Sequence, residues 1–504
     1  MERIDTLSSL EFFRPEIVLV LSLMWVLIWD LILKNRPRER RAVLVGSTLL
    51  GLVIALGFAF AGTDAPSMGL FSNMVALDGF GNVLRILFIV TAIFVLLFTL
   101  HSNELKSVHH GELLVLLLTA TVALIWMANS INLLMIYLAL ETVSVASYVM
   151  VGYLKSDRLS NEASLKYILF GAVSTGTMLF GLSLLFGLTG SLDLYGIRSA
   201  LASQEVVASS GPALMVVIVL VLAGIGFKMA TVPFHFWCPD VYTGAPTPVT
   251  AFLSVGPKVA GFAVLVRFFY GGLSEPIGSA NWAMVGSVDW QTILMVVSVL
   301  TMTLGNVAAL TQTNVKRLLA YSSIAHAGYI MMGAAVLSGE GIQAMIAYMI
   351  VYLFMNLGAF LVVIVVHNEV GSFDVKDYAG IWRRAPMLTV VMGVFLFSLM
   401  GIPPFAGFLA KWYIFAAVIK AGLGWFAVVG VANSAIGAYY YLKILRTMFI
   451  DGDDTPEPTK PMPLQPVYAG LLFVLVVPNI IGLLLWGYLD QVAEYSKRLL
   501  DVVL

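Results

Sequence analysis

The sequence predicts an all-α integral membrane protein with about fourteen transmembrane helices, two of them broken, arranged in two inverted five-helix repeats. The first reason is composition: 60% of the 504 residues are hydrophobic and only 11% are charged. Soluble globular chains carry about 25% charged residues, so the main solvent of this chain must be lipid. The other reasons are recurring apolar runs long enough to span a bilayer, and two proline-broken runs within a weak internal repeat.

Composition also excludes several classes of protein. The formal net charge of -1 gives no sign of a nucleic-acid partner. The chain has one cysteine, Cys238, which excludes internal disulfides and iron–sulfur clusters held by cysteines. No Rossmann or phosphate-binding glycine motif occurs at a strand-to-helix junction. Any redox or nucleotide chemistry linked to this protein is therefore expected in another chain.

Apolar runs of at least ~18 residues mark the candidate spans. The first, residues 17–33, is expected to remain as a helix, because neither the basic start nor the cleavage site of a signal peptide is apparent. Polar stretches at 61–78, 190–210 and 451–465 are expected to be connections, and the last is proline-rich and exposed. The predicted spans are centred near residues 25, 52, 91, 120, 142, 176, 223, 259, 300, 328, 355, 402, 436 and 477.

Lysine and arginine in the connections predict the orientation. The connection after the first span contains Lys34, Arg36, Arg38, Arg40 and Arg41. Alternate connections counted from this one hold about fifteen basic residues, and the opposite set holds about eight. Because cytoplasmic connections carry the basic excess, both termini are expected on the non-cytoplasmic side, in keeping with an even number of spans.

A short stretch of the fifth predicted span recurs in the tenth. Residues 146–152 are ASYVMVG and residues 327–333 are AGYIMMG. Two helices after each copy comes a broken span, which contains VPF at 232–234 and PPF at 403–405. Inverted repeats with paired broken helices are typical of transporters, whose ion site lies near the breaks. Chance similarity between low-complexity membrane helices is the alternative.

The repeat divides the chain into four parts. Residues 1–110 form an N-terminal three-helix segment, 111–270 the first five-helix unit and 271–450 the second. Residues 451–504 hold a loop and the last helix. An odd number of helices in each unit places the second unit upside down relative to the first.

Ionisable residues within the spans are the candidate functional residues, because charge at bilayer depth costs ~2.5–3.5 kcal/mol by insertion scales. The strongest candidates are Glu141, Lys228, Lys258 and Lys411. Burial favours the neutral form of a lysine and a nearby carboxylate favours its charged form, so Glu141 and Lys228 could switch charge together near neutral pH. Lys258 and Lys411 would extend this pair into a chain of protonatable stations linked by water. Auxiliary candidates at or near membrane depth are Lys166, His235 and His326.

Structural roles are the alternative for these residues. Glu141 and Lys228 could form a static pair that holds helices together, and His326 could be only a helix-contact residue. Lys166 could snorkel to the membrane interface. Three further charged residues are expected to have structural roles. Lys316 is expected to snorkel to the membrane interface, Asp240 to form a turn or cap, and Arg267 to anchor a helix end.

Four segments together resemble one family. They are FKMATVPFHFWCPDVYTGAPTPVTAFLSVGPKVAGFA at 227–263, SNEASLKYILFGAVSTG at 160–176, NVKRLLAYSSIAHAGYIMMG at 314–333 and GIPPFAGFLAKWYIF at 401–415. The chain from about residue 110 to 450 resembles the antiporter-like membrane subunits of respiratory complex I, the proton-pumping NADH–quinone oxidoreductase. The resemblance implies fourteen helices with two inverted five-helix repeats.

The resemblance also implies a role for each candidate residue. Glu141 would pair with Lys228, Lys258 would be the central station, and Lys411 would lie near the exit. Two auxiliary members of the same hydrophilic axis would be Lys166 and His235. One sister subunit of the family carries glutamate where Lys411 stands, and another ends in a lateral helix for which the tail after Gly487 leaves no room. Both points indicate that this chain corresponds to neither of these two subunits and resembles the third antiporter-like sister instead.

The function implied is outward proton transport, coupled to electron transfer to quinone elsewhere in the complex, by a translocase subunit without a redox centre. The chain would bind no cofactor or metal, while NADH, FMN, iron–sulfur clusters and quinone would bind other subunits. Its partners would be the other membrane subunits, including its antiporter-like sisters, in a bacterial cytoplasmic (inner) membrane. Two alternatives remain: a subunit of a multisubunit cation/proton antiporter, and a non-conducting membrane scaffold.

Overall fold

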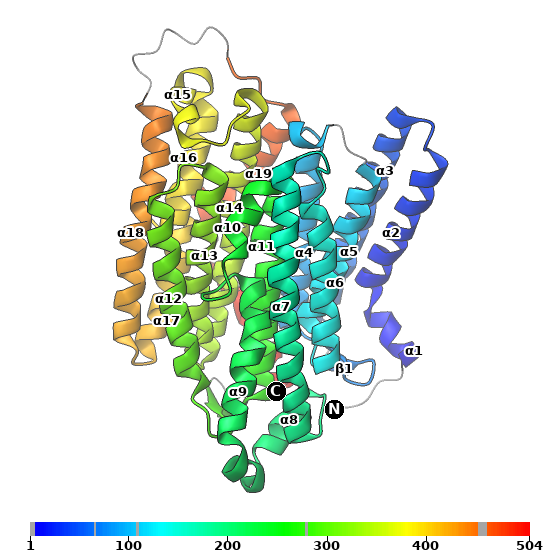
Figure 1. Cartoon of the computed structure of the whole chain (residues 1–504), viewed down its shortest axis with the longest axis vertical. Helices are drawn as coiled ribbons and strands as arrows, with labels where there is room; N and C mark the ends of the chain where they lie inside the picture. Colours follow the sequence, from blue (N-terminus) through cyan, green and yellow to red (C-terminus); the bar gives the residue numbers. More distant parts are fainter. Residues whose placement is uncertain (1–5, 65–66, 107–109, 278–280, 452–460, 504) are drawn as a thin grey trace.

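The structure is a computed structural model that describes residues 6–64, 67–106, 110–277, 281–451 and 461–503. Long helices lie side by side along the long axis of the molecule, with short elements at the two ends (Figure 1). The all-α membrane architecture predicted from the sequence is confirmed.

The elements follow one another without a separate soluble domain in the described residues. The first part contains α1 (Thr6–Ser9), η1 (Leu10–Phe12), α2 (Arg14–Ile32), α3 (Pro37–Ala61), η2 (Gly62–Asp64), β1 (Met68–Leu70), β2 (Val75–Leu77), α4 (Gly79–Thr99) and η3 (Asn103–Leu105). The next part contains α5 (His110–Asn129), α6 (Leu133–Val151), α7 (Arg158–Thr189), α8 (Leu194–Leu201), α9 (Gln204–Met229), α10 (Trp237–Gly244), α11 (Thr247–Val266) and the π-helix η4 (Arg267–Gly272). The last part contains β3 (Ser274–Ile277), β4 (Asn281–Met284), α12 (Trp290–Leu310), α13 (Val315–Ala334), α14 (Gly339–Val370), η5 (Val375–Tyr378), α15 (Ile381–Arg384), α16 (Pro386–Met400), α17 (Ala406–Lys420), α18 (Gly424–Phe449) and α19 (Pro466–Val503).

Every predicted span centre lies in a helix except the one near residue 402, which lies between α16 and α17. Among the described residues, 11 helices are long and apolar enough to cross a membrane, or up to 12 if the bent α19 counts as one span. Helix α13 does not meet this criterion, and neither do α16 and α17, each 15 residues long. The total of fourteen spans therefore stays a prediction.

Both breaks occur where proline and a left-handed residue end a helix. Helix α9 stops at Ala230 (φ 58°), before Pro233, and α10 begins at Trp237. Helix α16 stops at Gly401 (φ 82°), before Pro403 and Pro404. Proline has no N–H to donate and clashes with the preceding turn, so neither helix can continue. The broken helices predicted at these positions are confirmed.

Short strands and a short helix occur in connections for which the sequence predicts no regular structure. Strands β1 and β2 form an antiparallel hairpin within residues 61–78. Strands β3 and β4 form a second hairpin after η4, and α8 lies within 190–210. Strands this short give no clear alternating pattern in the sequence. Most of the proline-rich loop predicted at 451–465 lies outside the described residues.

One backbone motif occurs once in each predicted repeat. Asn132 pairs with Asp193 beside the start of α6, and Asn314 pairs with Asp374 beside the start of α13. Both asparagines also cap the helix that follows through their side chains. The first motif adjoins α8 and the second lies just before α15, at opposite ends of the molecule (Figure 1). This correspondence supports the inverted repeat and the boundaries between its units, which remain predictions.

Helix α11 lies at the centre of the bundle. All of its residues are buried, and it packs against α4, α5, α9, α13 and α14. Helices α2 and α3 lie at one edge and expose much of their apolar surface (Figure 1). Lys258 on α11 is therefore buried inside the bundle.

Candidate functional site

Three of the four strongest candidates lie almost wholly buried in the bundle. Lys228 on α9, Lys258 on α11 and Lys411 on α17 are 0%, 3% and 5% exposed. We refer to Lys228, Lys258 and Lys411 as the axis lysines. Burying an ammonium group is costly unless polar groups surround it, so the partners of each lysine indicate what the lysine can do.

Lys228 lies in the last turn of α9, directly before the first break. Its Nζ has no hydrogen-bond partner among the described residues. Glu141 on α6 is half-buried and lies within electrostatic reach of Lys228, yet the described residues show no direct ion pair between the two. The structure thus places Glu141 and Lys228 near each other and not in contact, so the functional pair remains a prediction.

Lys258 lies at the middle of α11 and faces α13. Its Nζ donates a 2.6 Å hydrogen bond to Ser323 Oγ and lies 5.7 Å from the centre of the Tyr242 ring. A cavity of about 10 Å³ adjoins Lys258, Ser323 and Tyr352. That volume is at the lower limit for a single water molecule. Lys258 therefore contacts a hydroxyl group and a small cavity, and a proton could leave it by either.

A histidine and two tyrosines lie between Lys258 and Lys411. His326 on α13 is buried, with Nδ1 at 2.7 Å from the Tyr348 hydroxyl and Nε2 at 3.1 Å from the Tyr441 hydroxyl. Tyr441 in turn lies 2.5 Å from Ser322 Oγ. His326 is within electrostatic reach of both lysines. The imidazole can exchange a proton through either nitrogen, so this cluster can link the two lysines.

Lys411 lies at the second break and donates a hydrogen bond to the end of α16. Its Nζ donates to the backbone oxygen of Met400, the last residue of α16, at 2.9 Å and to Ser434 Oγ at 2.9 Å. The ammonium also lies 4.8 Å from the centre of the Tyr329 ring. The last carbonyls of a helix have no partner within the helix and carry partial negative charge. The break therefore supplies a free backbone oxygen, that of Met400, which stabilises the buried ammonium group of Lys411.

The two remaining auxiliary candidates, Lys166 and His235, differ in how deeply they are buried. Lys166 has a 38% exposed side chain and forms ion pairs with Glu162 at 2.8 Å and Asp240 at 2.7 Å. The structure therefore does not bring Lys166 into the buried part of the site. His235 lies in the first break, is 4% exposed, and its Nδ1 has no hydrogen-bond partner among the described residues.

Three structural expectations were wrong. Lys316 is 1% exposed and does not snorkel: its Nζ donates to Ala245 O at 2.6 Å and lies 3.7 Å from Glu104 Oε1. Arg267 is no interface anchor, because it is buried against Asp78. Asp240 is neither a cap nor a loop residue, since it lies in α10 and forms ion pairs with Lys166 and Arg317. The partners of Lys316 and Arg267 are distant in sequence, so no local signal could have identified them.

No group of three or more His, Cys, Asp or Glu side chains placed to hold a metal ion occurs in the part of the chain that the structure describes. The expectation that this chain binds no cofactor remains a prediction.

A many-helix membrane bundle with two proline-broken helices, and a buried lysine beside each break, defines an antiporter-like membrane protein. Residues 130–437 match the family model described as NADH:quinone oxidoreductase/Mrp antiporter, TM, and the chain belongs to that family. The resemblance seen in the sequence is thus confirmed.

Relatives and solved structures agree with this assignment. The chain is 42% identical to NADH-quinone oxidoreductase subunit N of Anaeromyxobacter sp. (strain Fw109-5), over 98% of each chain. It is 30% identical to a chain of respiratory complex I from Thermus thermophilus, with a TM-score of 0.77, covering 95% of this chain and 98% of that one. A chain of the Mrp complex from Dietzia sp. DQ12-45-1b shares the fold, with a TM-score of 0.79 at 20% identity over 98% of each chain. The third sister that the sequence resemblance favours corresponds to subunit N, the name carried by the relative at 42% identity.

Proposed function

We propose that this chain is a proton-translocating membrane subunit of a proton-pumping NADH–quinone oxidoreductase, corresponding to subunit N. The relative at 42% identity carries that name, and the match covers nearly the whole of both chains. Electron transfer from NADH to quinone, with the FMN and iron–sulfur clusters that serve it, takes place in other subunits. The chain acts beside other membrane subunits, including its antiporter-like sisters, in the inner membrane of a bacterium.

One observation carries the proposal: the axis lysines are buried without a carboxylate contact among the described residues, beside hydroxyls, backbone oxygens and a histidine cluster. A lysine held this way can release its proton without leaving a buried counter-charge unpaired. Protons pass from Glu141 and Lys228 through Lys258 and His326 to Lys411. Each charge moved against ~100 mV costs ~2.3 kcal/mol, so the redox reaction must drive this transfer through neighbouring subunits.

The test compares buried and exposed lysines in the complete complex, purified and reconstituted into vesicles. We expect Lys228→Ala and Glu141→Ala each to lower the rate of proton pumping, measured with a pH-sensitive dye inside the vesicles. Lys420→Ala is the matched control, because Lys420 is a lysine at the surface, paired with Glu340. Unimpaired pumping in both Lys228→Ala and Glu141→Ala complexes would contradict the proposal.

The two alternatives have separate tests. A cation/proton antiporter shares the fold, but it would co-purify in mild detergent with small antiporter subunits, whereas we expect the subunits of an NADH–quinone oxidoreductase. A non-conducting scaffold requires that replacing the axis lysines by leucine leaves pumping intact, provided that the complex assembles. The identity to subunit N of Anaeromyxobacter favours the proposed function over both.

A further inference from the structure

A second group of buried charges lies outside the axis lysines. Glu104 on η3 is 3.7 Å from Lys316 Nζ, and the two side chains are 12% and 1% exposed. His367, near the end of α14, lies within electrostatic reach of both. Its ring stacks on Phe373 at 3.9 Å, and its Nδ1 has no hydrogen-bond partner among the described residues. The proposed proton path does not use this acid–base cluster.

Glu104 connects the cluster to the helix that carries Lys258. Its Oε2 accepts a 2.8 Å hydrogen bond from the backbone N–H of Thr247, the first residue of α11. An ionised carboxylate is favoured at a helix N-terminus by the partial positive charge there. The same carboxylate thus contacts Lys316 through one oxygen and the start of α11 through the other.

From that point a row of hydroxyl groups leads along α11 to Lys258. Thr247, Thr250, Ser254 and Lys258 are spaced by three, four and four residues, which places them on one face of the helix. At 1.5 Å per residue the row is about 16 Å long. All four residues are buried. Thr247 Oγ1 has no hydrogen-bond partner among the described residues, and Thr250 Oγ1 donates to the backbone oxygen of Tyr242 at 3.1 Å. Ser254 Oγ donates to the backbone oxygen of Ala251 at 2.7 Å and accepts a 2.5 Å hydrogen bond from Asn356.

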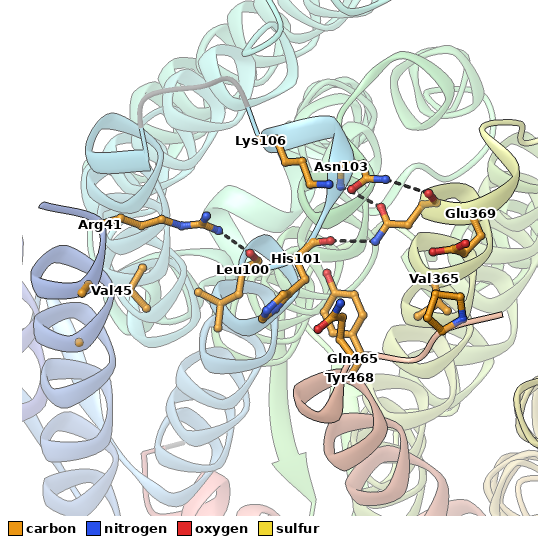
Figure 2. Close-up of a pocket in the computed structure, with 14 residues that line it drawn as sticks. Arg41, Val45, Leu100, His101, Asn103, Lys106, Val365, Glu369, Gln465 and Tyr468 are labelled. Carbon is orange, nitrogen blue, oxygen red and sulfur yellow. Dashed lines mark hydrogen bonds between the residues drawn. The ribbon is translucent and has the colours of Figure 1, made fainter. Parts of the chain in front are cut away.

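The loop that carries Glu104 also forms the wall of an open pocket. The pocket has a volume of about 680 Å³, and the polar side chains of Arg41, His101, Asn103 and Lys106 form part of its lining. Figure 2 shows these side chains around the opening, with Asn103 from the same turn as Glu104. Arg41 belongs to the basic connection that the charge distribution assigns to the cytoplasmic side. Water can therefore reach the neighbourhood of Glu104 from that side.

We propose that Glu104 is the proton-uptake residue of this subunit, and that Thr247, Thr250 and Ser254 pass its proton to Lys258. This inference rests on the proposed function. The carboxylate takes a proton from cytoplasmic water. Because no hydrogen bond joins neighbouring hydroxyls of the row among the described residues, water molecules that enter between them must complete the path. Each hydroxyl or water accepts one proton and releases another, so one proton reaches the neutral amine of Lys258 and Glu104 is again ionised. Lys316 is a positioning residue that holds the carboxylate at the start of the row.

The test uses isosteric variants of the complete complex in vesicles. Glu104→Gln keeps an oxygen that can accept from Thr247 N–H but cannot carry the proton, whereas Glu104→Asp keeps the acid. A positioned proton donor contributes ~10²–10⁴-fold to a transfer rate, so we expect Glu104→Gln to lower the pumping rate by roughly tenfold or more. Glu104→Asp should restore most of it. Wild-type pumping by Glu104→Gln would overturn the proposal, because glutamine cannot take up and release a proton.

A second pair of variants tests the proposed uptake route if the complex with Glu104→Gln does not assemble. Thr250→Val removes the hydroxyl from the row at nearly constant volume, and Thr250→Ser retains it. We expect slowed pumping in the valine variant and near-normal pumping in the serine variant. Equal pumping rates in the two variants would contradict proton transfer along the row of hydroxyl groups.

Lys228→Ala, measured in parallel, separates this proposal from the proposed function. If Lys228→Ala and Glu141→Ala both pump normally, the proposed function fails. If Lys228→Ala is impaired while Glu104→Gln and Thr250→Val pump normally, only the uptake route fails.

Discussion

Buried charges in this chain differ in whether an opposite charge touches them. Arg267 contacts Asp78, and Arg85 lies 2.7 Å from Glu16, with all four side chains at 3% exposure or less. The axis lysines instead contact hydroxyls and a backbone oxygen, or no polar atom among the described residues. Arginine does not release its proton in a protein, so a carboxylate that contacts it in a dry interior is held ionised, because neutralising the carboxylate would strand the buried arginine. The arginine pairs are therefore expected to be structural, whereas the proposed function requires the axis lysines to titrate.

This difference predicts that two substitutions of buried charged residues lower the stability by very different amounts. Asp78→Asn keeps the cap of α4, since asparagine also accepts from the Gly81 N–H, but leaves Arg267 buried without a counter-charge. We expect it to lower the free energy of unfolding by about 3–5 kcal/mol. Lys258→Met, which removes a buried charge that has no carboxylate partner, should cost much less. Thermal unfolding and the yield of assembled complex in mild detergent measure both effects. An Asp78→Asn protein as stable as the wild type would contradict the structural role of the pair.

The sequence predicted these residues unequally, for a physical reason. An isolated lysine in an apolar run is improbable unless it has a function, so Lys228, Lys258 and Lys411 could be found without a structure. Lys316 stands beside Arg317 near the start of a helix, where snorkelling is the ordinary explanation. Only tertiary structure brings Glu104 to it, from more than 200 positions away in the sequence.

At the scale of elements, the second break shapes the site through one glycine. Gly401 has φ 82°, a conformation that costs a residue with a side chain roughly 1–2 kcal/mol. A Cβ added there would also lie 2.7 Å from Cδ of Lys411. The glycine therefore ends α16 and leaves room for the lysine that caps it.

Gly401→Ala should displace Lys411 from the Met400 carbonyl and slow proton pumping. Gly422→Ala is the matched control, because Gly422 has φ 78° but no atom within 4 Å of an added Cβ. Both variants should lose stability in thermal unfolding because of the positive φ, and Gly401→Ala should lose more because its Cβ also meets Lys411. Only Gly401→Ala should pump more slowly in reconstituted vesicles. Equal pumping in the two variants would show that the break does not position Lys411.

Elements were predictable in proportion to their length. Apolar runs and prolines place the long helices and both breaks, because lipid requires each spanning segment to satisfy its own backbone hydrogen bonds. Hairpins β1–β2 and β3–β4 are three and four residues per strand, too short for an alternating pattern to stand out. Helix α13 carries polar residues that face the buried cluster around His326, which lowers its hydropathy below that of an ordinary span.

Over the whole molecule, basic residues collect at one end. The connection of α2 and α3 lies at the same end as α15, whereas α1 and α8 lie at the other (Figure 1). Exposed basic side chains at the first end include Lys34 and Arg36 from the former connection and Arg383 from α15. The positive-inside rule assigns this end to the cytoplasm. The proposed uptake at Glu104 requires that orientation, because protons must be taken up on the cytoplasmic side.

Cysteine labelling tests this orientation directly. Asn35→Cys lies in the exposed connection of α2 and α3, and Ser199→Cys lies exposed on α8 at the opposite end. The sole native cysteine, Cys238, is fully buried, so the unmodified chain supplies the background. A maleimide that cannot cross membranes should label Asn35→Cys only in vesicles with the cytoplasmic side outward, and Ser199→Cys only in vesicles of the opposite orientation. The reverse labelling pattern would place Glu104 on the outer side of the membrane. Proton uptake at Glu104 would then be refuted, and the proposed path would run in the opposite direction. This conclusion would hold even if every buried lysine were needed for pumping.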